Sequence, residues 1–115
     1  MEPAVVHAAA AAPRVRLGLR YDPQGGSERV PSHHGEHLSH VVAAEARGAD
    51  LVWISERPFT KGAAIPSALP VCASLCAATS TIRSGAGPLN LPIHHPLRVA
   101  EDAATLDGLS GGRLE

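Results

Sequence analysis

The chain has 115 residues, enough for one domain with a hydrophobic core, and a formal net charge of −1 from 10 Lys and Arg against 11 Asp and Glu. The basic residues are scattered rather than clustered, which argues against a nucleic-acid partner. No apolar run approaches the ~20 residues that a membrane-spanning helix needs, which argues against a membrane partner. A composition with 44% hydrophobic residues predicts a globular protein.

The N-terminal stretch, 1–13, contains an alanine run but has neither a basic start nor a long apolar segment, so no signal peptide is expected. We expect 1–13 to be a disordered leader and 14–115 to be the folded domain. The cysteines, Cys72 and Cys76, are four positions apart, which suits one face of a helix better than a disulfide. Two buried thiols favour a reducing, cytoplasmic location.

Hydrophobic periodicity and turn residues predict alternating strands and helices. A first strand is expected at 15–19, running on to Tyr21, and a loop is expected at 24–32. Apolar residues at helical spacing predict a helix at 36–47. The continuous apolar run at 51–54 predicts a strand that is buried on both faces, as in a parallel sheet.

The same order repeats in the second half of the chain. A loop at 58–65 is followed by a second predicted helix at 66–79. A third strand is expected to begin at 81–83 and to continue through its glycines toward Leu91. The residues at 92–95 then predict a turn.

A third helix is expected from Pro96, because proline suits the first helical position, where its missing N–H costs nothing. Gly111-Gly112 ends this helix, and 113–115 predicts the first residues of a fourth strand. The order β-α-β-α-β-α with a stub of β implies parallel strands. The pattern is compatible with both an open doubly wound sheet and a barrel. No glycine-rich dinucleotide motif follows the first strand, which argues against a dinucleotide-binding doubly wound sheet.

Two parts of the sequence resemble the N-terminal barrel signature of the bacterial-luciferase-like flavin-dependent oxidoreductases and monooxygenases. One is ADLVWISE at 49–56, and the other runs from 79 to 115. The most specific block is LPIHHP at 91–96, followed by AED at 100–102, LD at 106–107 and SGGR at 110–113. The resemblance covers about 14–115.

The resemblance implies an α/β fold that is part of a TIM (β/α)₈ barrel, with about three β/α units plus the start of strand four. Since such barrels need ~250 residues, the chain is expected to be truncated. The implied cofactor is a reduced flavin, FMN or coenzyme F420, at the C-terminal ends of the strands. FMN would serve monooxygenation with O₂, and F420 would serve hydride transfer, in both cases on a small organic substrate.

In the resembled family, later loops hold the flavin phosphate, so the phosphate site is expected to be missing from this chain. The alternative function, from a different class, is a non-catalytic truncated fragment without a complete flavin site. Such a fragment could self-associate through its open sheet edges.

The resemblance also implies that the flavin ring packs against a bulge in the third strand, often with a cis peptide. Gly85, Ala86, Gly87 and Pro88 occupy that place and are the predicted cofactor-binding residues. Small residues let a backbone approach a flat ring, and proline interrupts a strand. We expect a cis Gly87–Pro88 bond, because an X–Pro bond lowers the cost of the cis form to about 0.5–1 kcal/mol. The alternative is a simple strand break.

Tyr21, Glu56 and Asn90 are the predicted substrate-pocket residues, at the same end of the sheet as Gly87. For Glu56 the alternative is a structural carboxylate that ties its loop to a neighbouring strand. Family members commonly carry a histidine directly after this glutamate. Arg57 follows here, so no catalytic residue is assigned.

A group of histidines precedes and enters the first predicted helix, but no carboxylate or thiolate completes a known ligand motif. No metal site is therefore predicted. His94 and His95, in the turn before the third helix, are expected to be structural. The histidine group consists of His33, His34, His37 and His40.

Overall fold

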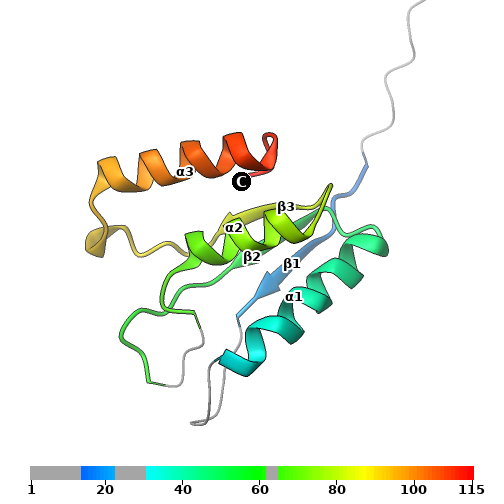
Figure 1. Ribbon diagram of the computed structural model, residues 1–115, viewed down its shortest axis with the longest axis horizontal. Helices are drawn as coiled ribbons and strands as arrows, with labels where there is room; N and C mark the ends of the chain where they lie inside the picture. Colours follow the sequence, from blue (N-terminus) through cyan, green and yellow to red (C-terminus); the bar gives the residue numbers. More distant parts are fainter. Residues whose placement is uncertain (1–13, 23–30, 62–64) are drawn as a thin grey trace, which may run out of the picture.

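The computed structural model describes residues 14–22, 31–61 and 65–115, and these form a three-stranded sheet with helices beside it (Figure 1). The predicted leader, 1–13, lies outside the described residues. The predicted alternation of strands and helices is confirmed. In chain order the elements are β1 (Gly18–Tyr21), α1 (Pro31–Ala46), β2 (Leu51–Ile54), α2 (Ala68–Ala78), β3 (Arg83–Ala86), the 3-10 helix η1 (Leu91–Ile93) and α3 (Pro96–Ser110).

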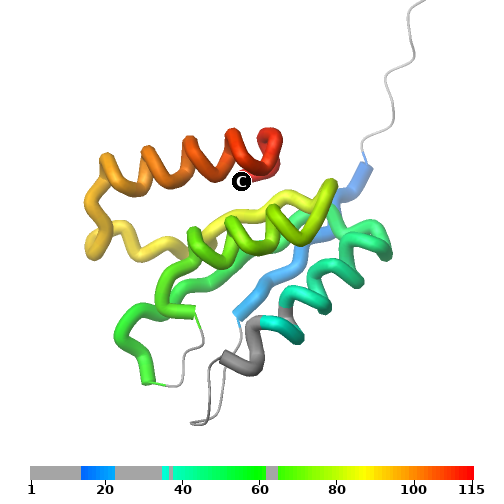
Figure 2. The backbone as a smooth tube through the Cα atoms, in the orientation of Figure 1, coloured from blue at the N-terminus to red at the C-terminus, as the bar shows by residue number. Residues whose placement is uncertain are grey.

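The strands are parallel and follow one another in the order β1-β2-β3. Tyr21 pairs with Ile54, and Ile54 pairs with Ala86, so the C-terminal ends of the strands meet at one edge. After α3 the chain returns to the sheet, as the red end of the tube in Figure 2 shows. There Leu114 forms a parallel bridge with Ser84, which confirms the predicted start of a fourth strand.

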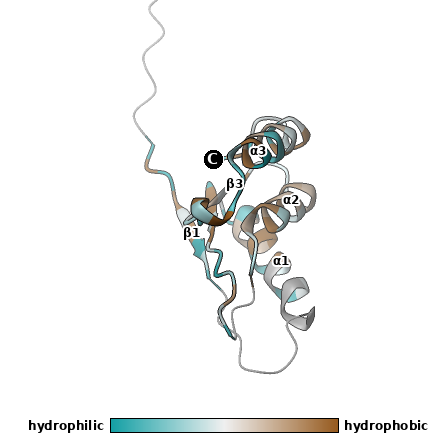
Figure 3. Cartoon of the chain, turned by 90° about the vertical axis from the view of Figure 1, so that its left-hand side faces the viewer, coloured by the Kyte–Doolittle hydropathy of each residue, from teal (hydrophilic) through white to brown (hydrophobic). Residues whose placement is uncertain are grey.

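The core lies between the sheet and the helices, which occupy one side of the strands (Figure 3). Val52 and Ile54 of β2 are fully buried, whereas Leu51 and Trp53 on the other face are half-buried. The prediction that this strand is buried on both faces is therefore only half right. The helices contribute Val41, Ala68, Cys72, Leu75, Cys76 and Leu106 to the core.

The cysteines are both free and buried in α2, on the face that packs into the core. Burial raises the pKa of Cys72 to about 11, so this thiol is a packing group rather than a nucleophile. No helix in the described ranges is long and apolar enough to cross a membrane.

Several element boundaries differ from those predicted. Helix α1 begins at Pro31, inside the predicted loop, because proline is well suited to a first helical turn. Strand β1 begins at Gly18 rather than at Val15. Strand β3 ends at Ala86, because Pro88 has no N–H for a ladder hydrogen bond.

The ends of α3 match their predictions. Pro96 is its first residue, and Gly111 follows it in the left-handed region at φ 71°, with its N–H donating to Asp107 O and Gly108 O. The predicted turn at 92–95 overlaps η1, whose last N–H bond runs from His94 N to Leu91 O. Helix α3 is thereby fixed at both ends, and the loop before it is compact.

A carboxylate that the sequence analysis did not single out fastens α1 to the start of β3. Glu45 Oε1 accepts hydrogen bonds from the backbone amides of Ser80, Thr81 and Ile82, at 2.8, 2.5 and 3.0 Å. Burial alone would raise the pKa of Glu45, but these amides and the Thr81 hydroxyl outweigh it and lower the pKa to about 2. Glu45 therefore stays ionised.

Arg113, which follows α3, also fastens elements together. Its guanidinium donates to Cys76 O, Thr79 Oγ1, Ile82 O and Ser110 O, at 2.7 to 3.2 Å. It binds carbonyl and hydroxyl oxygens at the end of α2, and so joins α2, α3 and β3 near the N-terminal edge of the sheet. A cation suits the end of a helix, where carbonyl groups lack partners.

Candidate functional site

The C-terminal edge of the sheet carries the predicted site residues. Backbone hydrogen bonds extend the pairing past the strands, from Ser55 N to Tyr21 O at 3.0 Å and from Gly87 N to Ile54 O at 2.8 Å. Tyr21, Glu56 and Gly87 therefore follow or end adjacent strands at the same end, as expected. Ligands of parallel α/β sheets bind at this end.

The Gly87–Pro88 peptide bond is cis, as predicted. The backbone at this bond is held from the neighbouring strand, because Ser55 Oγ donates to Gly87 O at 3.1 Å. Arg20 Nε in turn donates to Ser55 Oγ at 3.1 Å. A chain of hydrogen bonds thus links β1, the end of β2 and the segment after β3. Strand β3 pairs without interruption up to Ala86, so the structure has a strand end here and not the predicted bulge.

Two glycines at the C-terminal end of β3, Gly85 and Gly87, make room for Trp53. A Cβ atom on Gly85 would lie 2.7 Å from Trp53 Cζ3, and a Cβ atom on Gly87 would lie 2.7 Å from Trp53 Cε3. Both distances are too short for any side chain, so the indole rests directly on the glycine backbone. The flat ring against these glycines is therefore one of the protein's own side chains.

Trp53 is a site residue that the sequence analysis missed. Its signal was present, since it alternates with the fully buried Val52 and Ile54 and so faces the opposite side of the sheet. It also pairs in register with Gly85. A large residue opposite a glycine on a neighbouring strand is a complementary pair, but the pairing register is needed to see it.

Glu56 is a buried polar residue of this edge, with a side chain that is 0% exposed. Its carboxylate accepts hydrogen bonds from Asn90 N at 2.6 Å, Ala68 N at 3.2 Å and the His94 ring at 3.0 Å. Burial opposes ionisation, but these donors prevail and lower the pKa of Glu56. Glu56 thus ties the start of α2 to the loop before α3, whereas its structural alternative had its loop tied to a neighbouring strand.

Asn90 and Tyr21, the other predicted pocket residues, lie close to Glu56 along the chain or the sheet. Asn90 Nδ2 donates to Glu56 O at 3.4 Å, in addition to the bond from its backbone amide. The Tyr21 side chain packs against the core, and burial raises its pKa to about 12. Tyr21 is therefore a neutral phenol at this edge.

His94 was expected to be structural, and the structure brings it to Glu56. The two residues are 38 positions apart, so no local motif joins them. The His94 side chain remains 26% exposed while its Nε2 lies 3.0 Å from the buried carboxylate. A partly open imidazole backed by a buried carboxylate is an arrangement found in acid–base sites.

Arg57 occupies the position where the resemblance implies a histidine. Its Nε and one terminal nitrogen bind both oxygens of Asp22, at 3.0 and 2.6 Å, and this pairing raises the pKa of Arg57. Arg20 binds the same carboxylate at 3.0 Å. The loops after β1 and β2 are therefore joined by an ion-pair network at the mouth of the sheet.

The side chains of His33, His34 and His37 lie outside the description, so the structure does not test the histidine group. Among the described side chains, no three of His, Cys, Asp and Glu gather as a metal ion would require.

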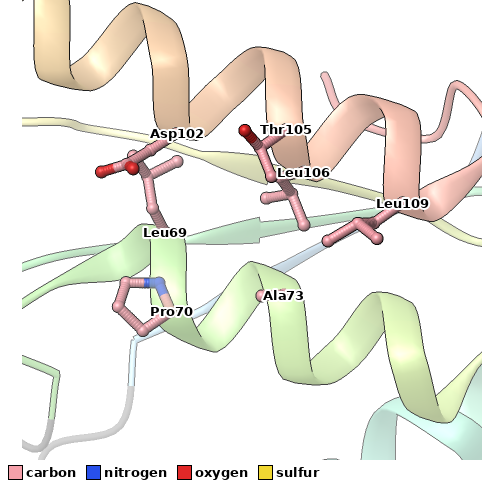
Figure 4. A pocket seen from close by; sticks show the side chains of 7 residues that line it. All are labelled: Leu69, Pro70, Ala73, Asp102, Thr105, Leu106 and Leu109. Atoms are coloured by element: carbon pink, nitrogen blue, oxygen red, sulfur yellow. The ribbon is translucent and has the colours of Figure 1, made fainter.

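A groove of about 260 Å³ lies between α2 and α3 (Figure 4). Its lining is mostly apolar and includes Leu69, Ala73 and Leu109, with Asp102 at one end. It belongs to the helical layer rather than to the C-terminal edge of the sheet.

Comparison with known proteins decides the family. The family model for luciferase-like monooxygenases matches residues 19–115. The chain belongs to the luciferase-like monooxygenase family. The resemblance inferred from the sequence blocks is thereby confirmed.

Relatives with curated descriptions agree. A luciferase-like monooxygenase of Escherichia coli K12 is 34% identical over 99 residues, which are 86% of this chain and 29% of that protein. The alkanal monooxygenase alpha chain of the Kryptophanaron alfredi symbiont is 34% identical over 73 residues, 64% of this chain and 20% of its own. The chain therefore spans less than a third of the length of these relatives.

Solved structures show the same fold. Monooxygenase RslO1 from Streptomyces bottropensis superimposes with a TM-score of 0.81 at 28% identity, over 88% of this chain and 32% of its own. The coenzyme F420-dependent tetrahydromethanopterin reductase of Methanopyrus kandleri gives 0.64 at 28% identity, over 89% and 26%. The oxygenating constituent of Pseudomonas putida 3,6-diketocamphane monooxygenase, solved with FMN, gives 0.80 at 24% identity, over 88% and 28%. The chain thus has the fold of part of a luciferase-like TIM barrel, as predicted.

Proposed function

We propose that this chain supplies the first three β/α units of a flavin-dependent oxidoreductase, with its part of the flavin and substrate site at the C-terminal edge of the sheet. The observation that carries the proposal is the half-buried Trp53 ring lying directly on Gly85 and Gly87 at the C-terminal edge of the sheet. Family membership supports the oxidoreductase class. FMN and F420 are the candidate cofactors, and a small organic molecule is the candidate substrate.

The residues at this edge fit the ring system of a flavin. Trp53 covers Gly85 and Gly87 with a flat aromatic surface, and the exposed Pro88 stands next to it. Aromatic rings stack well on such surfaces at small cost in conformational entropy. In this proposal the ring contacts Trp53 and the Gly87–Pro88 edge, and Gly85 and Ala86 act mainly by keeping Trp53 in place.

The fit does not extend to the phosphate. The guanidinium groups nearest the mouth, those of Arg20 and Arg57, are already bound to Asp22. We therefore expect the phosphate to be held by a part of the barrel outside this chain.

When bound, the flavin would supply the redox step, oxygenation with O₂ for FMN or hydride transfer for F420. The residues of this chain would position the ring and shape the pocket. Glu56 would keep the loop before α3 in place, and Asn90 would line the substrate side. Tyr21, whose side chain packs against the core on the helix side of the sheet, would support this edge from behind instead of lining the pocket as predicted. Exclusion of water by Trp53 and the packed strand end would protect the reduced ring.

Reconstitution tests the proposal. The 115-residue chain is combined with the segment of the E. coli luciferase-like monooxygenase that lies beyond its aligned 99 residues. We expect a complex that binds FMN or F420 and consumes reduced flavin in the presence of O₂ or of an acceptor. Gly87→Ala should weaken flavin binding by displacing Trp53, whereas Gly108→Ala, in α3 with nothing within 4 Å, should not. A folded complex that binds neither cofactor would overturn the proposal.

A further inference from the structure

The Glu56–His94 pair could transfer a proton, which is a role that binding a flavin ring does not require. We propose that His94 is a proton-transfer residue at the mouth of this sheet, that Glu56 is the positioning residue behind it, and that the ligand it serves carries an ionisable O–H group. The proposal deepens the proposed function, on which it rests for the existence of a substrate site at this edge.

The hydrogen-bond geometry fixes the tautomer of the imidazole. A carboxylate can only accept hydrogen bonds, so the His94 Nε2 that lies 3.0 Å from Glu56 Oε1 carries the proton. The remaining ring nitrogen, Nδ1, then has a free lone pair in the neutral ring. No residue in the described part of the chain bonds to Nδ1, which leaves this nitrogen for a ligand.

The different burial of Glu56 and His94 shows which of the two a ligand could reach. The Glu56 side chain is 0% exposed, so no ligand can reach its carboxylate, whereas the His94 side chain is 26% exposed. Backbone amides of Ala68 and Asn90 also bind the carboxylate and keep it ionised and fixed in place. The fixed carboxylate therefore holds the imidazole in one orientation and one tautomer, with Nδ1 left for a ligand.

The position of the pair matches the position of the proposed site. Glu56 directly follows Ser55, whose hydroxyl holds the Gly87 carbonyl of the cis Gly87–Pro88 bond. Asn90, which bonds to Glu56 through both its backbone and its side chain, belongs to the same loop as this bond. His94 therefore stands on the loop that leads from this bond into α3.

The proton balance is simple. The O–H bond of the ligand breaks, its electron pair stays on the ligand oxygen, and the proton passes to Nδ1 of neutral His94. The imidazolium then faces the Glu56 carboxylate, and the proton returns to the ligand or product from the same nitrogen. No oxidant or reductant enters this step, which can precede or follow the redox step of the flavin.

A purely structural clasp predicts different behaviour. If Glu56 and His94 only hold two loops together, His94 should be a less reactive histidine than its exposed neighbour His95, which makes no side-chain capping bond. If the carboxylate activates His94, the partly buried ring should be the more reactive one. The two readings therefore predict opposite orders of reactivity: His95 reacts faster if solvent accessibility decides, and His94 reacts faster if the carboxylate activates it.

Acylation of the reconstituted complex, which contains the whole 115-residue chain, with diethyl pyrocarbonate at neutral pH measures this order, since the reagent attacks unprotonated ring nitrogens. We expect His94 to react at Nδ1 and faster than His95, with fragment-ion mass spectrometry separating the two sites. Glu56→Gln should slow His94 by about tenfold, because a neutral amide accepts the Nε2–H more weakly than a carboxylate does, and leave His95 unchanged. Slower acylation of His94 than of His95 in the unsubstituted chain overturns the proposal, even if Glu56→Gln does not fold.

Two further measurements complete the test. Long-range ¹H–¹⁵N spectra of the chain should show His94 as the Nε2–H tautomer, and an Nδ1–H tautomer would overturn the proposal. In the reconstituted complex, His94→Gln should lower turnover by about 100-fold, as for loss of a general base, while flavin binding is retained. If His94 reacts as expected but the protein never binds flavin, the result would support the role of His94 and would contradict only the proposed flavin function.

Discussion

Trp53 illustrates how a single residue can occupy the place predicted for a ligand. Gly85 and Gly87 were predicted to admit a flavin ring, and their backbone does admit a flat ring, but that ring is the indole of Trp53. The predicted flavin and the observed indole would make the same kind of contact, a flat aromatic ring on residues without side chains. What changes is the order of the layers, because Trp53 covers the glycines, and a flavin would have to contact Trp53 and could reach the backbone only along the Gly87–Pro88 edge.

Alanine at Gly85 or Gly87 should therefore destabilise the fold without any cofactor present. Each substitution places a Cβ atom 2.7 Å from the Trp53 ring, and such overpacking costs about 1–3 kcal/mol. Urea unfolding would measure this loss, and Trp53, the sole tryptophan, would report the displaced ring by its fluorescence.

Gly108→Ala is the matched control, since nothing lies within 4 Å of a Cβ atom there and the residue is inside α3. It should stabilise the chain by about 0.5–1 kcal/mol, because alanine is the better helix former. Equal effects of all three substitutions would show that Trp53 does not rest on the glycines.

At the scale of elements, charged side chains join helices to the sheet at its N-terminal edge. Glu45 extends from α1 to the turn before β3, and Arg113 extends from the end of α3 to the end of α2. Each satisfies several backbone groups that the ends of helices and strands leave without partners. These contacts hold the elements in register far from the proposed site.

Glu45 should make stability depend on pH in the acid range. Its pKa in the folded chain, about 2, lies below its usual value of 4.5. The stabilisation is therefore fully present above about pH 4.5 and is lost as the pH falls toward 2. Glu45→Gln should remove about 1–2 kcal/mol at neutral pH, a modest value because Glu45 is only half-buried. Unfolding free energies of the two chains, measured against pH, should converge in acid; a constant difference would contradict this origin.

Arg113→Ala should be among the more damaging single substitutions of a charged residue. It leaves the oxygens of Cys76, Thr79 and Ile82 without their donor, a loss of about 2–3 kcal/mol. Arg98→Ala is the matched control, since Arg98 is 77% exposed and makes one i,i+4 ion pair with Asp102. That substitution should cost only about 0.3–0.5 kcal/mol. Thermal unfolding of the two variants compares them, and similar costs would argue against the bridging role of Arg113.

At the scale of the whole molecule, the described sheet is covered by helices on one side only (Figure 3). Leu51 and Trp53 on the other side are half-buried, and Leu17 beside β1 is 60% exposed. In a closed barrel both faces of every strand are covered and no strand has a free edge. The outer edge of β1 and the inner face of the sheet are thus surfaces that the rest of a barrel would cover.

We therefore predict that the isolated chain self-associates or is partly folded, and that it binds flavin weakly or not at all. The ring contacts near Trp53 and Pro88 would have to hold the cofactor without a phosphate site. Size-exclusion chromatography with detection of flavin absorbance tests both points. A compact monomer that elutes with stoichiometric flavin would show that these residues form a complete site of their own.

The sequence by itself determined the order of the elements, the family, the ends of α3 and the cis bond before Pro88. These features depend on local rules: hydrophobic period, proline and glycine at helix ends, and a specific string of residues at fixed spacing. The same rules placed Tyr21, Glu56 and Gly87 at one end, because parallel strands bring their C-terminal ends together.

Only the tertiary structure decided what those residues touch. The pairing register put Trp53 on Gly85, and the fold of the loop before α3 brought His94 to Glu56 across 38 positions. Neither contact has a local signal, because each joins segments whose distance is set by packing rather than by spacing in the chain. A carboxylate at a strand end could equally face solvent or be buried. The Glu56 carboxylate is buried because its hydrogen-bond donors come from α2 and from the loop after β3, which only the fold brings together.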